Sequence, residues 1–213
     1  MANLIAPHGG YKNLKSFQMA LIVYDLTAQF LPRYVQRYTK RWDQMDGAAR
    51  SGAFNLGEGS QTSGTSKQSE LRLVDVNRAS LEELKLDYEA FLRQNDLPLW
   101  NKNDARILAI RKLAYAPNKS YKTYMSYLDK PEPAANCLLT LINQAGYLLD
   151  QQLRALQRDL AEKGDFRERY KEERKRQILG RQDDEKEFLK QFGIEFDENG
   201  LVIYGDKNID KPK

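Results

Sequence analysis

Three long segments of the sequence share one periodicity, with an apolar residue at about every third or fourth position and one polar exception, Asn77. A row at this spacing covers one side of an α-helix and has to be buried against neighbouring helices. The rows are Leu14, Phe17, Leu21, Tyr24, Ala28 and Leu31, then Val74, Asn77, Leu81, Leu84, Tyr88 and Phe91, then Leu138, Leu141, Ile142, Ala145, Leu149, Leu153, Leu156 and Leu160. The periodicity predicts an all-α protein, an antiparallel four-helix bundle over residues 11–163.

Helix boundaries can be placed from residues that start or stop helices. Pro32 is expected to end or kink the first helix, because proline lacks a backbone N–H and clashes with the preceding turn. A second long segment runs from about Trp42 to Glu58, and Ser66 is a suitable N-cap for the third helix. The fourth begins near Pro133 and ends at about Lys163, where the next residue, a glycine, is expected at the C-cap.

Two regions depart from this pattern. Residues 94–133 contain prolines, asparagines and two short apolar-periodic pieces, which predict an insert of one or two short helices. Residues 164–213 form a suffix region in which a highly charged helix, DFRERYKEERKRQIL, precedes a shorter helix, DDEKEFLKQF. GIEFDENGLVIYG then predicts a small β-hairpin around Asn199-Gly200, and disorder is expected for DKNIDKPK.

The run DGAARSGAFNLGEGSQTSGTS is rich in glycine and small residues, which permits two interpretations. A phosphate-binding loop would need a preceding strand and a lysine followed by serine or threonine, whereas Gly59 is followed by Ser60 and Gln61. A helix whose face of small residues lets another helix approach closely fits the spacing of Ala48, Gly52, Leu56 and Gly59 better. Under this interpretation Asn55 and Glu58 face the bundle interior or a subunit interface, Gly59 ends the turn, and Glu83 bonds to Asn55 or Arg50.

Charge is distributed unevenly along the chain. The 213 residues carry 34 basic and 30 acidic side chains; residues 1–164 hold 22 and 17, residues 165–181 hold 7 and 4, and residues 182–213 hold 5 and 9. This layout is compatible with polyanion binding. Two sets of basic residues are candidates for nucleic-acid contact: Arg33, Arg37, Lys40 and Arg41 at helical spacing among tyrosines, and Arg167, Arg174, Lys175 and Arg176 in the suffix. A solvated helical face is the alternative for both.

Composition argues against several classes of site. One cysteine, Cys137, and one histidine, His8, are too few for a disulfide framework or a thiolate or imidazole zinc site. A Cys–His pair is formally possible, although His8 lies in a segment expected to fray. A carboxylate metal site around Glu58, Asp75, Glu82 and Glu83 would lack the histidines typical of such bundles. No metal, cofactor or catalytic group is expected, and the absence of a signal peptide or long apolar run predicts a soluble, cytoplasmic protein.

Three blocks, YKNLKSFQMALIVYDLT, QMDGAARSGAFNLGEGS and RASLEEL, resemble the signature blocks of a four-helix-bundle family first noticed in intervening sequences of bacterial 23S rRNA genes. The family includes the accessory variability proteins of diversity-generating retroelements. The similarity covers about residues 11–93, and its motif residues here are Asn55, Gly57, Glu58, Gly59, Ser80 and Glu83. Asp46 and Gly47 stand where the family commonly has two arginines. The run from Asn136 to Arg176 resembles a suffix found on one branch.

This resemblance implies a homo-oligomer, a ring-like pentamer, that binds nucleic acid and protein without being an enzyme. We therefore expect a self-associating scaffold or adaptor that binds RNA or DNA through a basic face. The alternative is a protein–protein interaction module that docks a co-encoded partner through its suffix region. Neither hypothesis involves a membrane.

Overall fold

The structure is a computed structural model that describes residues 10–192, 194–197 and 202–204. The chain divides into two compact units, residues 1–166 and residues 167–213. In the described part of the chain, no helix combines the length and apolar character needed to cross a bilayer.

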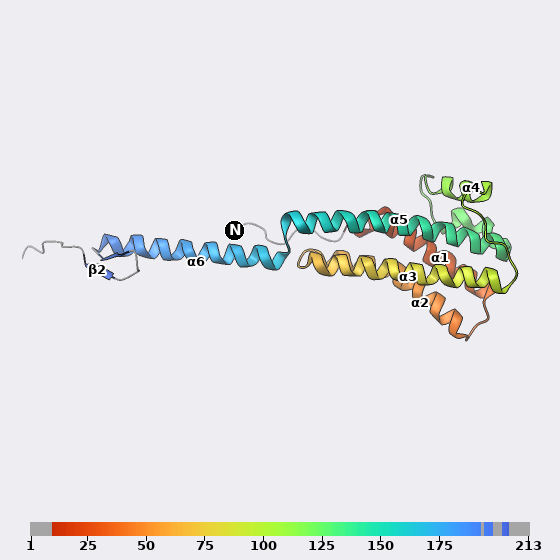
Figure 1. The fold of residues 1–213 in the computed structure, drawn as a ribbon, viewed down its shortest axis with the longest axis horizontal. Helices are drawn as coiled ribbons and strands as arrows, with labels where there is room; N and C mark the ends of the chain where they lie inside the picture. Colours follow the sequence, from red (N-terminus) through yellow and green to blue (C-terminus); the bar gives the residue numbers. More distant parts are fainter. Residues whose placement is uncertain (1–9, 193, 198–201, 205–213) are drawn as a thin grey trace, which may run out of the picture. The chain divides into compact units, whose positions relative to one another are not determined.

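Four long helices make up most of the first unit, and each packs against two of the others (Figure 1). The four helices are α1 (Lys15–Tyr34), α2 (Lys40–Thr62), α3 (Lys67–Gln94) and α5 (Pro131–Lys163). Around the core, α1 contacts α2, α2 contacts α3, α3 contacts α5, and α5 contacts α1. A short 3₁₀ helix, η1 (Tyr11–Asn13), precedes α1. The expectation of a helical protein with long packed helices is thus confirmed.

The apolar row of α3 is buried as the periodicity predicts: Val74, Asn77, Leu81, Leu84, Tyr88 and Phe91 all belong to the interior. The row of α5 is also buried from Leu138 to Leu149, and Leu153 and Leu156 pack against the core. The row of α1 is rotated from the prediction. Ala28 is exposed, whereas Val23, Leu26 and Phe30 are fully buried, because α1 is apolar around more than one side and contacts both α2 and α5.

Capping residues define three of the helix ends. Thr39 Oγ1 accepts a hydrogen bond from the N–H of Trp42 at the start of α2, and Ser66 Oγ accepts one from Ser69 at the start of α3, as predicted. Gly164 follows α5 with a φ of 65°, a conformation that glycine adopts at little cost. Pro32 lies within the last turn of α1, which ends two residues later.

The small residues of α2 bring it against α3, its most extensive helix contact. Ala48, Gly52, Leu56 and Gly59 are all buried. A Cβ atom on Gly52 would lie 2.6 Å from Leu81 Cδ2, and one on Gly59 would lie 3.2 Å from the Cβ of a leucine of α3. The helix-contact interpretation is therefore correct, but Gly59 does not end the helix, which continues to Thr62.

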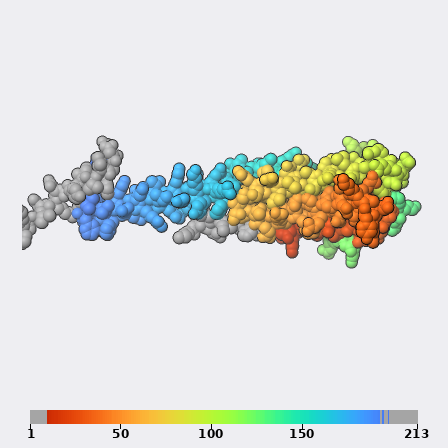
Figure 2. All heavy atoms as spheres, turned by 90° about the horizontal axis from the view of Figure 1, so that it is seen from below, coloured from red at the N-terminus to blue at the C-terminus, as the bar shows by residue number. Residues whose placement is uncertain are grey.

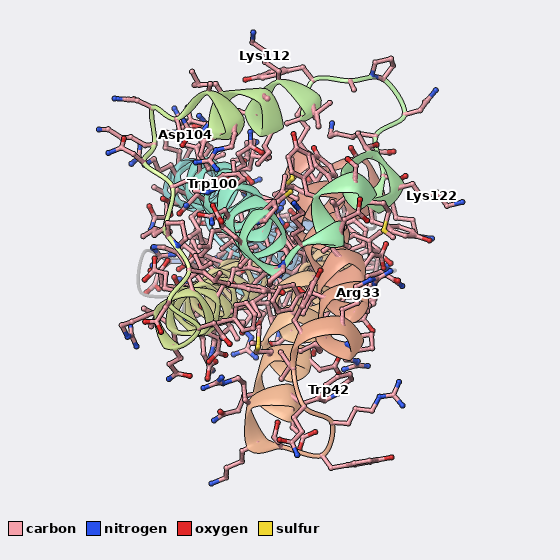
Figure 3. All side chains as sticks on the ribbon, turned by 90° about the vertical axis from the view of Figure 1, so that its right-hand side faces the viewer. Arg33, Trp42, Trp100, Asp104, Lys112 and Lys122 are labelled. Atoms are coloured by element: carbon pink, nitrogen blue, oxygen red, sulfur yellow. The ribbon has the colours of Figure 1, made fainter. Side chains whose placement is uncertain are left out.

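The insert folds into two short helices, α4 (Ala105–Leu113) and the 3₁₀ helix η2 (Tyr121–Asp129), which contact α5. Trp100 anchors its first half. The indole Nε1 donates to Glu132 at 2.6 Å, the backbone N–H donates to Asn136 Oδ1 at 2.8 Å, and the guanidinium of Arg106 lies 3.9 Å from the ring centroid. Figure 3 shows Trp100 beneath α4, near Asp104.

In the second unit, one helix, α6 (Phe166–Gln191), extends over the segment for which two helices are predicted. The prediction of a break is wrong: α6 continues through Gly180, because a single glycine lowers helix propensity by only about 1 kcal/mol. Strands β1 (Ile194–Phe196) and β2 (Val202–Tyr204) pair antiparallel. The predicted Asn199-Gly200 turn and the segment expected to be disordered, residues 206–213, lie outside the described residues, so the hairpin stays a prediction.

Candidate nucleic-acid interface

The first basic set lies around the corner between α1 and α2. Arg33 is in the last turn of α1, Arg37 is in the connection, and Lys40 and Arg41 begin α2. The sequence prediction that all four occupy one helical face is therefore wrong. They nevertheless lie within one short turn of the chain, and we call this group with Tyr38 the basic corner.

The chain turns here because three residues, Val35, Tyr38 and Thr39, leave the helical conformation. Val35 is extended, with φ −120° and ψ 134°, and Tyr38 has a φ of 61°. Thr39 is also extended; its hydroxyl donates to the carbonyl of Gln36 at 2.8 Å and accepts from Trp42 N–H at 3.3 Å. The hydroxyl thus joins the end of the connection to the first turn of α2.

Each arginine of the basic corner has a neutral partner. Arg33 donates to the carbonyl and side chain of Gln29, Arg37 lies 5.8 Å from the centroid of the Trp42 ring, and Arg41 donates to Gln94 on α3. No ion pair between the basic corner and a carboxylate is present within the described ranges. The positive charges of the basic corner are therefore available to bind an external anion.

Tyr38 is 97% exposed and occupies the left-handed region of backbone space, where a bulky residue is rarely found. Strained backbone of this kind is concentrated at functional sites. Sequence reasoning included Tyr38 only as one of several interleaved aromatics, because its exposure arises from the turn. The N-cap character of Thr39 could have located the start of α2, and hence the corner.

Acidic groups lie at the margin of the basic corner. The pKa of Asp87 on α3 is raised above its ordinary value by burial and by Glu83, although the Arg41 charge opposes the increase. Asp43 is exposed in the first turn of α2, where a negative charge is favourable to the helix dipole. The corner therefore has a positive centre with carboxylates on the side of α2 and α3.

The second basic set, on α6, consists of four exposed residues: Arg167, Arg174, Lys175 and Arg176. Arg167 and Arg174 are seven residues apart and share a face of the helix. Glutamates 168, 172 and 173 are interspersed among them, so this surface carries both signs of charge. The structure assigns these residues to the second unit and the basic corner to the first.

The motif residues of α2 and α3 meet through hydroxyl groups. Asn55 Nδ2 donates to Ser51 Oγ at 2.9 Å, and the hydroxyl oxygens of Ser51 and Ser80 lie 3.0 Å apart across the two helices. Gly57 faces the ring of Tyr11, which a Cβ atom would approach to 3.1 Å. These contacts support helix packing.

The sequence prediction is wrong about the surroundings of two carboxylates of the motif. Glu58 and Glu83 are both exposed, whereas the hypothesis turned Glu58 inward and made Glu83 a partner of Asn55 or Arg50. Asn55 bonds to Ser51 instead, and Arg50 lies over the ring of Phe54, 5.4 Å from its centroid. The helical period places Glu58 on the far side of α2 from its buried stripe.

The described residues contain no group of three or more histidine, cysteine, aspartate or glutamate side chains that could hold a metal ion. Cys137 is buried, and burial raises the pKa of its thiol. A raised pKa disfavours the nucleophilic thiolate. His8 lies outside the described residues.

Comparison of the chain with protein-family models, curated proteins and solved structures gives no significant match.

Proposed function

We propose that the protein is a non-enzymatic, self-associating adaptor that binds single-stranded nucleic acid through the basic corner. The observation that carries the proposal is the fully exposed ring of Tyr38 among Arg33, Arg37, Lys40 and Arg41. Basic groups that follow a phosphate backbone, together with an aromatic ring on which a base stacks, are the usual elements of single-strand binding.

The mechanism is one of charge and stacking. Arg33, Arg37 and Lys40 are exposed and have no carboxylate partner in the described part of the chain, so phosphates would replace water and counterions around them. The first turn of α2 adds the partial positive charge of a helix N-terminus. Tyr38 would stack on a base, a contact that tolerates any sequence.

We further propose that α1, α2, α3 and α5 form the antiparallel four-helix bundle of the family that the motif blocks resemble. Its members associate into rings. In a pentamer of this kind each subunit would contribute one basic corner, so weak contacts would add through multivalency. The close approach of α2 and α3 at Gly52 and Gly59 supports this classification.

Neutralising the basic corner tests the proposal. We expect the variant with glutamine at Arg33, Arg37, Lys40 and Arg41 to bind labelled single-stranded RNA or DNA more weakly. The slope of log affinity against log salt should decrease by about 3, since four phosphate contacts are lost. Tyr38→Ala should weaken binding by about 1–3 kcal/mol without changing the slope. Fluorescence anisotropy at several salt concentrations measures both effects.

The matched control carries glutamine at four exposed basic residues elsewhere in the first unit: Arg72, Lys102, Arg154 and Arg158. It changes the net charge by the same amount but leaves the basic corner intact. If the two quadruple variants lose affinity equally, the interaction is a general effect of net charge and the basic corner is not the site.

A second candidate function is docking of a co-encoded protein through the suffix region. The supporting observation is the row of exposed apolar residues on and after α6, namely Ile178, Leu179, Phe188 and Phe192. The rings of Phe188 and Phe192 also contact each other, with centroids 5.1 Å apart. Contiguous exposed apolar side chains, such as these two rings, are typical of interaction surfaces.

Removing residues 167–213 distinguishes the two functions. If the suffix docks a protein partner, co-purification of that partner with the truncated chain is lost, whereas nucleic-acid binding by the basic corner persists. If truncation abolishes nucleic-acid binding instead, the basic residues of α6 are the interface and the basic corner is not.

A further inference from the structure

A cavity of about 750 Å³ lies between α1, α4 and α5 in the first unit. Among its lining residues Met19 is buried and Leu148 is half-buried, whereas the two tyrosines and two of the three cations are exposed. This volume falls within the ~300–1,000 Å³ typical of small-molecule sites. A larger hollow is lined by α5 residues alone between Gln151 and Ala161, so in the described part of the chain it lacks the facing walls that enclose a ligand.

The charged residues that line the cavity are all positive. Lys15 enters from the start of α1, Arg111 from α4, and Lys119 from the connection that follows α4. No aspartate or glutamate belongs to the lining, and none of these three cations is ion-paired within the part of the chain that the structure describes. Three converging, unpaired cations favour a ligand with more than one negative charge.

Two tyrosine rings flank the same cavity. Tyr115 is 88% exposed and Tyr147 is 63% exposed, although both line it. The hydroxyl of Tyr147 accepts a hydrogen bond of 2.6 Å from Gln151 Nε2, which holds this ring in place. Exposed, oriented rings beside cations are suited to a ligand with a flat ring, which can stack on them.

Amide groups complete the lining. Asn143, Gln144 and Gln151 follow the same side of α5. Gln144 Oε1 is buried and has no hydrogen-bond partner among the described residues, which is costly for a polar atom. Amides that both donate and accept are suited to the edge of a nucleobase.

We propose that this cavity is a binding site for a mononucleotide, with its phosphates held by Lys15, Arg111 and Lys119 and its base placed against Tyr115 and Tyr147. The site is independent of the basic corner. Lys15 and Arg33 are at opposite ends of α1, about 27 Å apart at the rise of an α-helix, so one mononucleotide cannot reach both.

Calorimetric titration of the full chain tests the site with three probes: ADP, adenosine and inorganic pyrophosphate. We expect ADP to bind at least about tenfold more tightly than either part of the molecule, because both the charge and the ring contribute. Binding of pyrophosphate as tight as that of ADP would contradict the assignment of the rings. Binding of adenosine as tight as that of ADP would contradict the assignment of the cations to the phosphates. If ADP at millimolar concentration gives no heat of binding, the proposal is overturned.

Two matched pairs of variants locate the site. Arg111→Gln should weaken ADP binding about tenfold, whereas Lys112→Gln should not, since Lys112 is next to it in α4 and points away from the unit (Figure 3). Tyr115→Leu should weaken binding about fivefold or more, whereas Tyr170→Leu, at an exposed tyrosine of the second unit, should not. Equal effects within either pair would overturn the site. ADP affinity that falls when the basic corner is neutralised would also contradict it.

Discussion

At the scale of the residue, Asn77 is the clearest local conflict in the fold. It is fully buried in the apolar row of α3, and neither its amide nitrogen nor its amide oxygen has a hydrogen-bond partner among the described residues. A buried amide without partners costs about 1–3 kcal/mol. Buried polar groups of this kind can also select one arrangement of helices over another.

Asn77→Leu should therefore raise the free energy of unfolding by about 1–3 kcal/mol, because it removes the unpaired amide from the core. Chemical denaturation followed by circular dichroism measures the change. Asn143→Leu, at an exposed position of α5, is the control and should change stability by only a few tenths of a kcal/mol through helix propensity. A destabilised Asn77→Leu would show that the amide is bonded in the native state. A changed solution mass would assign it a role in assembly.

A second residue-scale prediction concerns pH. Asp104 caps α4 by accepting from the N–H of Arg106 at 2.9 Å, and its carboxylate pairs with the guanidinium at 2.7 Å. These bonds to Arg106 lower the pKa of Asp104 from 3.8 to about 2. A lowered pKa in the folded state stabilises the fold above the unfolded pKa, and the contribution disappears as the pH falls from about 4 through 2.

We accordingly expect Asp104→Asn to melt at a lower temperature than the wild type at neutral pH, and the difference to vanish near pH 2. Thermal melts at several pH values measure this. Asp96→Asn is a suitable control, since Asp96 is exposed and has no ion pair in the described ranges. A difference that stays constant down to pH 2 would mean that charge on Asp104 does not contribute.

At the scale of the element, the approach of α2 to α3 depends on Gly52. An added Cβ atom there would lie 2.6 Å from Leu81 Cδ2 and 2.9 Å from its Cγ, and Leu81 is itself only 1% exposed. A completely surrounded leucine has no room to move away, so α2 and α3 would have to separate. Figure 2 shows these two helices, in orange and yellow, side by side on one face of the first unit.

Gly52→Ala should be less stable than Gly47→Ala by about 1–3 kcal/mol, the usual cost of overpacking. Gly47 is the matched position because it is in the same helix and a Cβ atom there meets nothing within 4 Å. Gly47→Ala should in fact stabilise the protein by about 0.5–1 kcal/mol through helix propensity. Equal unfolding energies for the two variants would show that the helices are not in close contact at Gly52.

Apolar periodicity predicts the buried face of a helix correctly when the apolar residues form one narrow face. It fails when apolar residues cover a broad part of the helix. In α3 all six predicted positions are buried, whereas Val76 and Leu86, which lie off that row, are exposed. In α1 two rows compete, and the choice between them depends on where α2 and α5 pack. The sequence does not predict the turn at the basic corner. Its four basic residues are spaced as they would be on one helix, although the chain turns at Tyr38 and Thr39.

The candidate mononucleotide cavity was not predictable from the sequence at all. Its cations are Lys15, Arg111 and Lys119, which are up to about a hundred positions apart, and no local motif connects them. They come together because the insert folds against α5 and α1. Sites of this kind follow from tertiary packing, whereas the small-residue contact of α2 follows from spacing within a single helix.

At the scale of the whole molecule, the two units are separated after Phe166, one residue beyond Asp165. Asp165 is buried, and its Oδ1 accepts the N–H of Lys67, the first residue of α3, at 2.8 Å. The same oxygen accepts the N–H of Phe166 at 2.9 Å. A residue beyond the end of α5 therefore caps α3, which is next to it in the core, and the first unit is complete only when Asp165 is included.

A chain ending at residue 166 should therefore retain the stability of the first unit, whereas one ending at residue 164 should lose about 1 kcal/mol, the typical value of a lost cap. Thermal melts of the two truncated chains measure this, with Asp165→Ala in the full chain as the third comparison. Asp165→Ala removes the carboxylate but keeps the suffix. In this variant the first unit should therefore melt at the same temperature as in the chain that ends at residue 164. If the three have the same stability, Asp165 does not tie α5 to α3. If the chain ending at 166 fails to fold, the two units depend on each other for stability.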